Sequence, residues 1–134
     1  MHSFRVRVYF SDTDAGGIIY HARYLDFAEH ARTEMLRSAL PDLSEHDLSG
    51  SGMLFVVRSI NIDYLKPGYL DDELEVQTSI ASLGAVSALL TQNIIRGDDI
   101  LASMTVRVAF IDKETKKPMR IPPEVRESLS CYTI

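Results

Sequence analysis

Hydrophobic and polar residues alternate along several stretches of the chain. From Phe4 to Phe10 every second residue is apolar, and Arg5 and Arg7 lie between the apolar positions. This period of two is typical of a β-strand with one buried face. The same period predicts further strands over 55–65, 73–80, 86–95 and 100–111. Turn signals rich in Gly, Pro and Asp separate these strands, so we expect consecutive strands to pair antiparallel.

The final predicted strand alternates most regularly. Its inward positions are predicted to be Ile100, Ala102, Met104, Val106, Val108 and Phe110. After it, prolines at 118, 122 and 123 leave room for at most one short terminal helix.

Between Ala22 and Leu40 the apolar spacing changes to three and four residues. This stripe consists of Tyr24, Phe27, Ala28, Ala31 and Met35. No Gly or Pro interrupts it and Pro41 follows, so the pattern predicts one long amphipathic helix. A polar, glycine-bearing connection over 42–53 leads to the later strands. The order β-α-β-β-β-β therefore predicts an α+β fold in which a curved antiparallel sheet wraps around one central helix. Sheet edges of this kind are commonly covered by oligomerisation.

Composition narrows the class of protein. The 134 residues, 46% of them hydrophobic, suit one domain over 1–134. A net charge of −5 argues against a dedicated nucleic-acid-binding protein. The single cysteine, Cys131, cannot form an internal disulfide, which favours a reducing, cytoplasmic location. The N-terminal residues do not resemble a signal peptide, and no apolar run is long enough to predict insertion into a membrane.

The segment DTDAGGIIYH, residues 12–21, joins the first strand to the helix. A helix N-terminus offers free N–H groups, and Gly16 and Gly17 let a ligand approach the backbone. A carbonyl oxygen bound there would be polarised, and a nearby carboxylate could attack the carbonyl or activate water. The alternative is ordinary turn chemistry, in which Asp12 or Asp14 accepts hydrogen bonds from neighbouring backbone N–H groups. The residues by themselves leave both hypotheses open.

Other chemistries find less support. Asp12, Asp14, His21 and His30 lie close in sequence but match no metal-site spacing, so no metal ligand is predicted. The remaining histidines, His2 and His46, are scattered and predicted to be solvated. The sequence contains no GxSxG elbow, no GxGxxG loop and no Walker A loop, and Cys131 lies in a terminal segment. A serine or cysteine nucleophile is therefore not expected.

The stretch VYFSDTDAGGIIYHARYLDFAEHARTEML resembles the signature of the 4-hydroxybenzoyl-CoA thioesterase family, in particular its YbgC-type acyl-CoA thioesterase branch. The later stretches NIDYLKPGYLDDELEV and AFIDKETKKPMRIP are similar to that family too. The resemblance implies the hotdog fold and hydrolysis of acyl-CoA to a free acid and CoA, without a metal or cofactor. It also implies homodimers, often paired into homotetramers, with active sites at the subunit interface.

The same resemblance assigns roles to single residues. Asp14 corresponds to the catalytic carboxylate, Gly17 to the motif glycine and His21 to the motif histidine. Backbone N–H groups near His21 would hold the thioester oxygen, and Tyr20 and Tyr24 would line the acyl pocket. Asp12 is expected to shape the turn and not to take part in catalysis. One departure is that Phe10 stands where this branch often has tyrosine, although Tyr9 is adjacent.

Several alternatives stay open from sequence. Asp14 could act as a nucleophile or as a general base, and His21 could orient water or the thioester, or assist departure of the thiolate. Arg58, Lys66 and Arg96 are candidates for binding the CoA phosphates. A non-catalytic acyl-CoA-binding or scaffold protein of the same fold is the main alternative function. A dehydratase-type hotdog enzyme is less favoured, because the sequence places its acid in the Asp14 loop and offers no suitable His/Glu pair.

Overall fold

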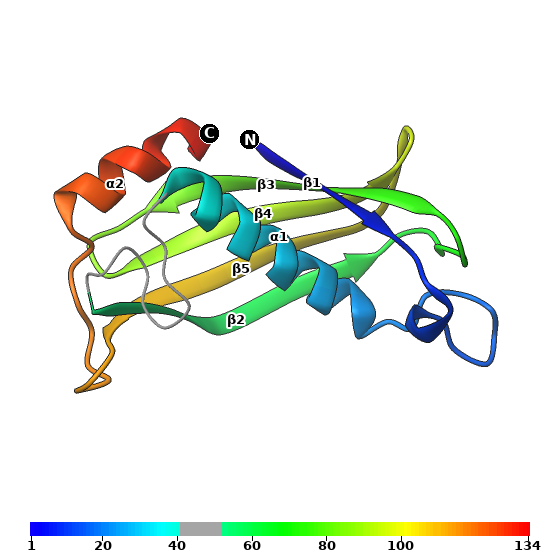
Figure 1. Ribbon diagram of the computed structural model, residues 1–134, viewed down its shortest axis with the longest axis horizontal. Helices are drawn as coiled ribbons and strands as arrows, with labels where there is room; N and C mark the ends of the chain where they lie inside the picture. Colours follow the sequence, from blue (N-terminus) through cyan, green and yellow to red (C-terminus); the bar gives the residue numbers. More distant parts are fainter. Residues whose placement is uncertain (41–51) are drawn as a thin grey trace.

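The computed structural model describes residues 1–40 and 52–134 (Figure 1). The elements in chain order are β1 (His2–Arg7), η1 (Phe10–Asp12), α1 (Arg23–Ala39), β2 (Met53–Tyr64), β3 (Glu73–Leu83), β4 (Ser87–Arg96), β5 (Asp99–Asp112), α2 (Pro123–Leu129) and η2 (Ser130–Tyr132). The predicted long helix, the strands and the short terminal helix are thus confirmed. Pro41, His46 and residues 42–51 of the predicted connection lie outside the described residues, while Gly52 lies in a turn and Met53 already belongs to β2.

The five strands form one antiparallel sheet in the order β1-β3-β4-β5-β2. Helix α1 lies across one face of this sheet, which is the hotdog arrangement (Figure 1). The expectation that all consecutive strands pair is wrong for β2 and β3. The backbone N–H groups of Leu65 and Lys66 donate to the Leu101 carbonyl oxygen at 2.8 and 3.2 Å, so the chain turns across β5 as it leaves β2. Strand β3 then pairs with β1 and β4 on the far side of the sheet.

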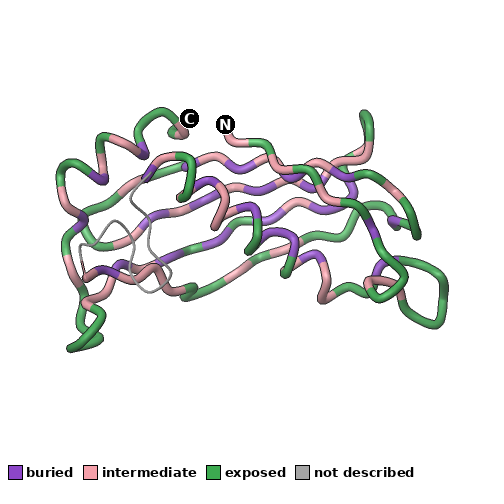
Figure 2. The backbone as a smooth tube through the Cα atoms, in the orientation of Figure 1, coloured by how far each residue is buried: buried purple, intermediate pink, exposed green. Residues whose placement is uncertain are grey.

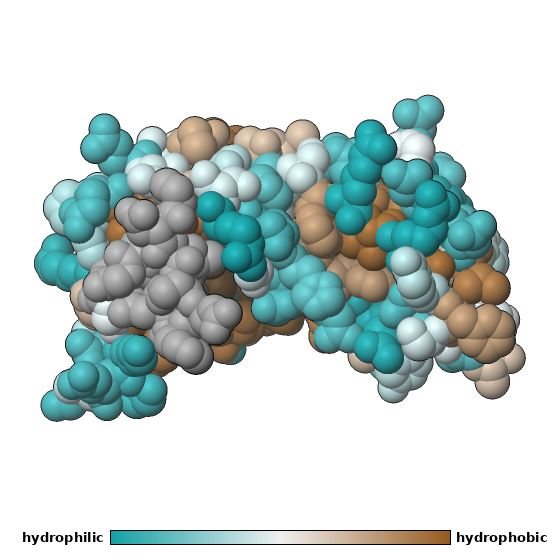
Figure 3. All heavy atoms as spheres, viewed as in Figure 1, coloured by the Kyte–Doolittle hydropathy of each residue, from teal (hydrophilic) through white to brown (hydrophobic). Residues whose placement is uncertain are grey.

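The core lies between α1 and the sheet. All five residues of the predicted helical stripe are buried, and they face the alternating apolar side chains of the strands (Figure 2). Burial of each large apolar side chain contributes about 1.5–3 kcal/mol. The outer side of α1 carries a hydrophilic band (Figure 3). Across residues 1–40 and 52–134, no helix combines the length and apolar character needed to span a membrane.

Two register predictions are wrong. The alternation predicts that Phe10 points inward, but β1 ends at Arg7 and the Phe10 side chain is 80% exposed. The cause is a turn held by Asp12, whose Oδ2 accepts a hydrogen bond from Tyr9 N at 2.9 Å. The alternation also predicts an inward Ile100, but this residue is 40% exposed, and Leu101 and Ala102 are both buried. An irregularity in the β4–β5 ladder at Ile94/Ile95 shifts the alternation there.

Candidate active site

The segment between η1 and α1 forms a tight turn at one end of the molecule (Figure 1). Thr13 and Ile19 are bridged antiparallel, and Asp14 N donates to Ile18 O at 2.9 Å. The turn closes with Gly17 N donating to Asp14 O at 3.1 Å. Gly17 has φ +80°, a left-handed conformation that strongly favours glycine. The motif glycine is therefore required by the backbone.

The Asp14 side chain is exposed at this turn. Its Oδ1 accepts a hydrogen bond from Gly16 N at 2.8 Å, as in an ordinary Asx turn. A Cβ atom at Gly16 would lie 3.2 Å from Asp14 Oδ1, so glycine there leaves room for the carboxylate. Its Oδ2 has no hydrogen-bond partner within the described part of the chain. One oxygen thus orients the carboxylate and the other is available for chemistry.

Asp12 has a structural role, as predicted. Besides its contact with Tyr9, its Oδ1 lies 3.8 Å from Arg23 Nε. Its carbonyl oxygen accepts a hydrogen bond from Tyr20 N at 2.8 Å. The Asp12 side chain is only 16% exposed. These contacts fix the turn against the first residue of α1.

The start of α1 offers unused backbone donors. Arg23 N donates to Tyr20 O at 2.8 Å, but no side chain caps the helix at Ala22. The N–H groups of His21 and Ala22 donate to no described residue. Free N–H groups at the positive end of a helix dipole bind and polarise carbonyl or anionic oxygens. The N–H groups next to the predicted site thus have no partner in the described part of the chain.

A hollow of about 250 Å³ lies beside this helix start. It is lined by Ile18, Ile19, His21, Tyr24, Tyr64, Leu65, Lys66 and Pro67. The Tyr64 hydroxyl donates to the His21 carbonyl oxygen at 2.8 Å, so the end of β2 is tied to the start of α1. The ring centroids of Tyr24 and Tyr64 are 5.4 Å apart. Burial raises the pKa of both phenols, so both are protonated near neutral pH.

The predicted site residues are only partly brought together. His21 and Tyr24 line the hollow. Tyr20 does not, but its ring centroid is 4.6 Å from that of His21. Asp14 and Gly17 lie on the turn that precedes the hollow and are not among its lining residues. Sequence reasoning missed the part played by Tyr64, because the period of two only places this residue on the same strand face as Ile60 and Ile62.

Two of the three proposed phosphate-binding cations are already engaged. Arg96 Nη1 lies 2.8 Å from Asp72 Oδ2 and donates to the Pro67 carbonyl oxygen at 3.1 Å. The hydrogen bond and charge of Asp72 raise the pKa of Arg96. Lys66 Nζ lies 2.7 Å from Asp99 Oδ1 and lowers the pKa of that carboxyl.

Arg58 differs from these two cations. It lies at the exposed irregularity of β2 between Val57 and Ser59 and makes no ion pair with a described residue. Among the three cations, Arg58 is therefore the one with no carboxylate partner in the described part of the chain. Within residues 1–40 and 52–134, no three His, Cys, Asp or Glu side chains gather as a metal site.

Comparisons with known proteins bear on the family of this chain. The sequence profile of the thioesterase-like superfamily matches residues 8–129. The acyl-CoA thioesterase YbgC of Haemophilus influenzae is 44% identical over 124 residues, covering 92% of this chain and 90% of that protein. YbgC of Helicobacter pylori strain J99 is 34% identical, covering 95% and 98%. The crystal structure of a probable thioesterase from Bartonella henselae is 37% identical with a TM-score of 0.81, covering 90% of this chain and 98% of that one.

Proposed function

Because the chain belongs to the thioesterase-like superfamily, we propose that it hydrolyses acyl-CoA thioesters to a free carboxylic acid and CoA, with Asp14 as the catalytic carboxylate. The observation that carries the proposal is the pairing of an oriented, exposed carboxylate with an uncapped helix start beside a hollow. Acyl-CoA hydrolysis needs both parts: a group that attacks or activates water, and donors for the oxygen that becomes negative.

The thioester carbonyl binds at the start of α1. The free N–H groups of His21 and Ala22 donate to its oxygen, and the helix dipole adds to the polarisation. Removing one such donor from an enzyme typically lowers kcat about 10²–10³-fold. The Tyr64 hydroxyl holds the His21 carbonyl and so positions these donors.

Asp14 then acts by one of two routes. As a nucleophile, Oδ2 attacks the carbonyl carbon, the C–S bond breaks to release CoA thiolate, and water hydrolyses the resulting anhydride. As a general base, the carboxylate takes a proton from water while the water oxygen attacks the same carbon; the C–S bond then breaks and the CoA thiolate takes up the proton. Both routes yield the free acid and CoA.

The residues around the helix start complete the site. The ring of His21 lies within reach of the hollow and orients the thioester or donates a proton to the departing thiolate. The rings of Tyr24 and Tyr64 line the hollow for the acyl group, and the ring of Tyr20 packs against that of His21. Arg58 is the cation that we assign to the CoA phosphates, because it has no carboxylate partner among the described residues.

We also propose that the protein acts in the cytoplasm as a homodimer or homotetramer. The 12-residue strand β2 is one edge of the sheet, and a long unpaired edge favours addition of a strand from a second copy. Light scattering after gel filtration measures the oligomeric state directly. A monomer at micromolar concentration contradicts this part of the proposal.

A panel of short, long and aromatic acyl-CoAs tests the activity, with release of CoA followed by a thiol reagent. Turnover of at least one member supports the proposal. One observation supports the alternative of a non-catalytic acyl-CoA-binding protein: Asp14 makes an ordinary Asx turn with Gly16, which requires no catalytic role for the carboxylate. Saturable binding of acyl-CoA without release of CoA supports that alternative.

A further inference from the structure

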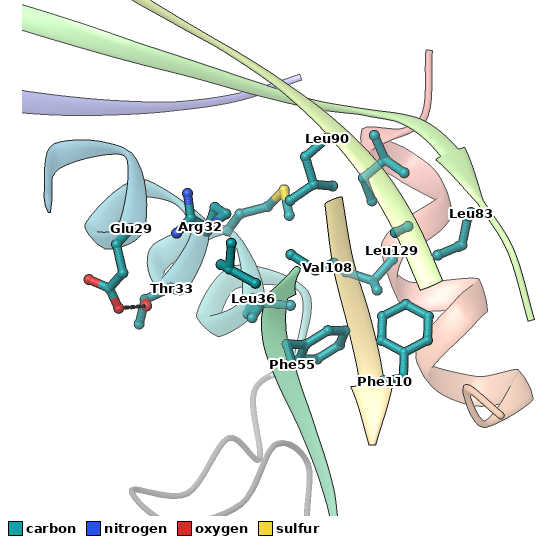
Figure 4. A pocket seen from close by; sticks show the side chains of 14 residues that line it. Glu29, Arg32, Thr33, Leu36, Phe55, Leu83, Leu90, Val108, Phe110 and Leu129 are labelled. Carbon is teal, nitrogen blue, oxygen red and sulfur yellow. Dashed lines mark hydrogen bonds between the residues drawn. The ribbon is translucent and has the colours of Figure 1, made fainter. Parts of the chain in front are cut away.

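A second pocket lies between the C-terminal half of α1 and the sheet (Figure 4). It shares no lining residue with the hollow beside the helix start. Its volume is about 150 Å³. Most of its walls are apolar, among them Leu36, Phe55, Leu90, Val108 and Phe110. Arg32 lies nine residues beyond the first residue of α1, which is roughly 14 Å along the helix axis. The pocket is therefore separate from the donors at the helix start.

Arg32 brings a positive charge to this apolar pocket. Its Nη1 donates to Gln92 Oε1 at 2.9 Å, and Gln92 is fully buried. This is the one hydrogen bond of the guanidinium to the described residues, and none of their carboxylates forms an ion pair with it. Burial lowers the pKa of Arg32. Charged groups partly removed from water are normally paired with an opposite charge, and the half-buried guanidinium of Arg32 has no such partner within residues 1–40 and 52–134.

The nearest acid does not fill this role. Glu29 also lines the pocket, and its charge raises the pKa of Arg32. Its Oε1, however, accepts a hydrogen bond from Thr33 at 3.1 Å, and its Oε2 lies 3.7 Å from His30 Nε2. Glu29 therefore contacts neighbours on its own helix, and the remaining N–H groups of Arg32 are unused within the described structure.

We propose that this pocket binds a small apolar carboxylate, with the carboxylate on Arg32 and the hydrocarbon body between Leu36, Phe55 and Phe110. A guanidinium matches a carboxylate with two parallel hydrogen bonds. A cavity of about 150 Å³ lined mostly by aliphatic and aromatic side chains is large enough for a benzene ring. The rings of Phe55 and Phe110 meet edge to face, with centroids 4.9 Å apart, and offer such a surface. The ligand class is thus an aromatic or short-chain monocarboxylic acid.

This binding requires neither Asp14 nor CoA, so it stands apart from the proposed hydrolysis. When both hold, the pocket takes the same class of acid that the reaction releases. The product acid then binds at a position distant from the reacting carbonyl, and the occupancy of this pocket rises as the acid accumulates.

Methyl NMR of the full chain labelled with ¹³C-methyl methionine tests the proposal, because this method detects ligands that bind with dissociation constants in the millimolar range. Sodium benzoate is expected to shift the Met35 signal saturably, since Met35 lines the pocket. The Met104 signal, which comes from the same strand as Val108 but four residues earlier, is the internal control. Benzamide, a neutral molecule of the same shape, is expected to bind roughly tenfold more weakly or worse.

Variants locate the carboxylate. Arg32→Gln is expected to weaken benzoate binding by roughly tenfold or more. Arg37→Gln is the matched control, because Arg37 lies on the same helix and is exposed beside Glu34. Asp14→Asn is expected to bind benzoate like the wild type, whether or not it hydrolyses acyl-CoA. The proposal is overturned if benzoate causes no saturable shift of the Met35 signal or if benzamide binds as tightly as benzoate. It is also overturned if Arg32→Gln binds benzoate normally or if Asp14→Asn loses benzoate binding.

Discussion

Replacing Gln92 by leucine tests how α1 is held on the sheet. Gln92 is fully buried on β4, and its amide makes three hydrogen bonds. Its Nε2 donates to the Ala28 carbonyl oxygen at 2.9 Å and to Thr78 Oγ1 at 3.0 Å. Its Oε1 accepts the bond from Arg32 at 2.9 Å. The amide therefore links the helix to two neighbouring strands in the middle of the core.

The expected loss of stability follows from which partners are left unpaired. Leucine has a similar size, so the cavity contribution is small. The Thr78 hydroxyl, also fully buried, loses its donor at a cost of about 1–3 kcal/mol. Arg32 loses one bond at about 1 kcal/mol, because water reaches part of its side chain. The added apolar surface returns about 1 kcal/mol. The free energy of unfolding is therefore expected to fall by about 2 kcal/mol.

Urea unfolding followed by circular dichroism measures this change, with the m-value expected to stay constant. Adding Thr78→Val to Gln92→Leu is expected to restore about 1 kcal/mol, because the orphaned hydroxyl is removed with its partner. Gln77→Leu on the neighbouring strand makes none of these contacts and is expected to change stability by less than about 0.5 kcal/mol. A Gln92→Leu variant as stable as the wild type refutes the reasoning, as does Thr78→Val destabilising both backgrounds equally.

Three further predictions concern the site and its support. Gly17→Ala is expected to lower the free energy of unfolding by about 1 kcal/mol in urea titrations, because alanine is strained at φ +80°; unchanged stability contradicts the assigned turn. Tyr64→Phe is expected to lower kcat for acyl-CoA hydrolysis about threefold to tenfold, because the His21 carbonyl loses its donor; unchanged kcat removes Tyr64 from the positioning role. Lys66 lowers the pKa of Asp99. This ion pair therefore stabilises the fold above the unfolded-state pKa of about 3.9. The stabilisation is lost as the pH falls through the lower folded-state pKa. Thermal unfolding of Lys66→Met is therefore expected to differ from wild type at pH 7 and to converge with it once the pH falls below the folded-state pKa of Asp99. A constant difference contradicts the ion pair.

The parts of the fold that depend on local periodicity are predictable from sequence. The helical stripe from Tyr24 to Met35 is buried as predicted, because a period of three and four on an uninterrupted segment has no competing interpretation. The failures depend on single side-chain contacts. Phe10 leaves the strand because Asp12 bonds back to Tyr9 N, and Ile100 turns outward because the ladder slips at Ile94/Ile95. Hydrophobic alternation alone contains no information about either event.

The candidate site divides in the same way. The turn, the two glycines and the helix start are contiguous in sequence, so their position next to one another can be predicted from the order of residues alone, while the residues themselves leave the catalytic and the ordinary-turn hypotheses open. Tyr64 reaches the same place from 43 residues away, and only the fold shows that it holds the His21 carbonyl. By residue type Arg96 and Lys66 are equally suited to phosphate, but the fold places Asp72 and Asp99 beside them. Long-range partners therefore decide which charges are free, and sequence spacing does not reveal them.

Turnover by Asp14→Asn tests the central claim most directly. Asparagine keeps the oxygen that accepts from Gly16 N, so the turn is retained while the charge and basicity are removed. Asp98→Asn, at an exposed turn, is the matched control and is expected to behave as the wild type. With the best acyl-CoA of the panel, Asp14→Asn is expected to bind normally and to release CoA about 10²–10⁴-fold more slowly. A folded Asp14→Asn protein that releases CoA as fast as the wild type contradicts the account.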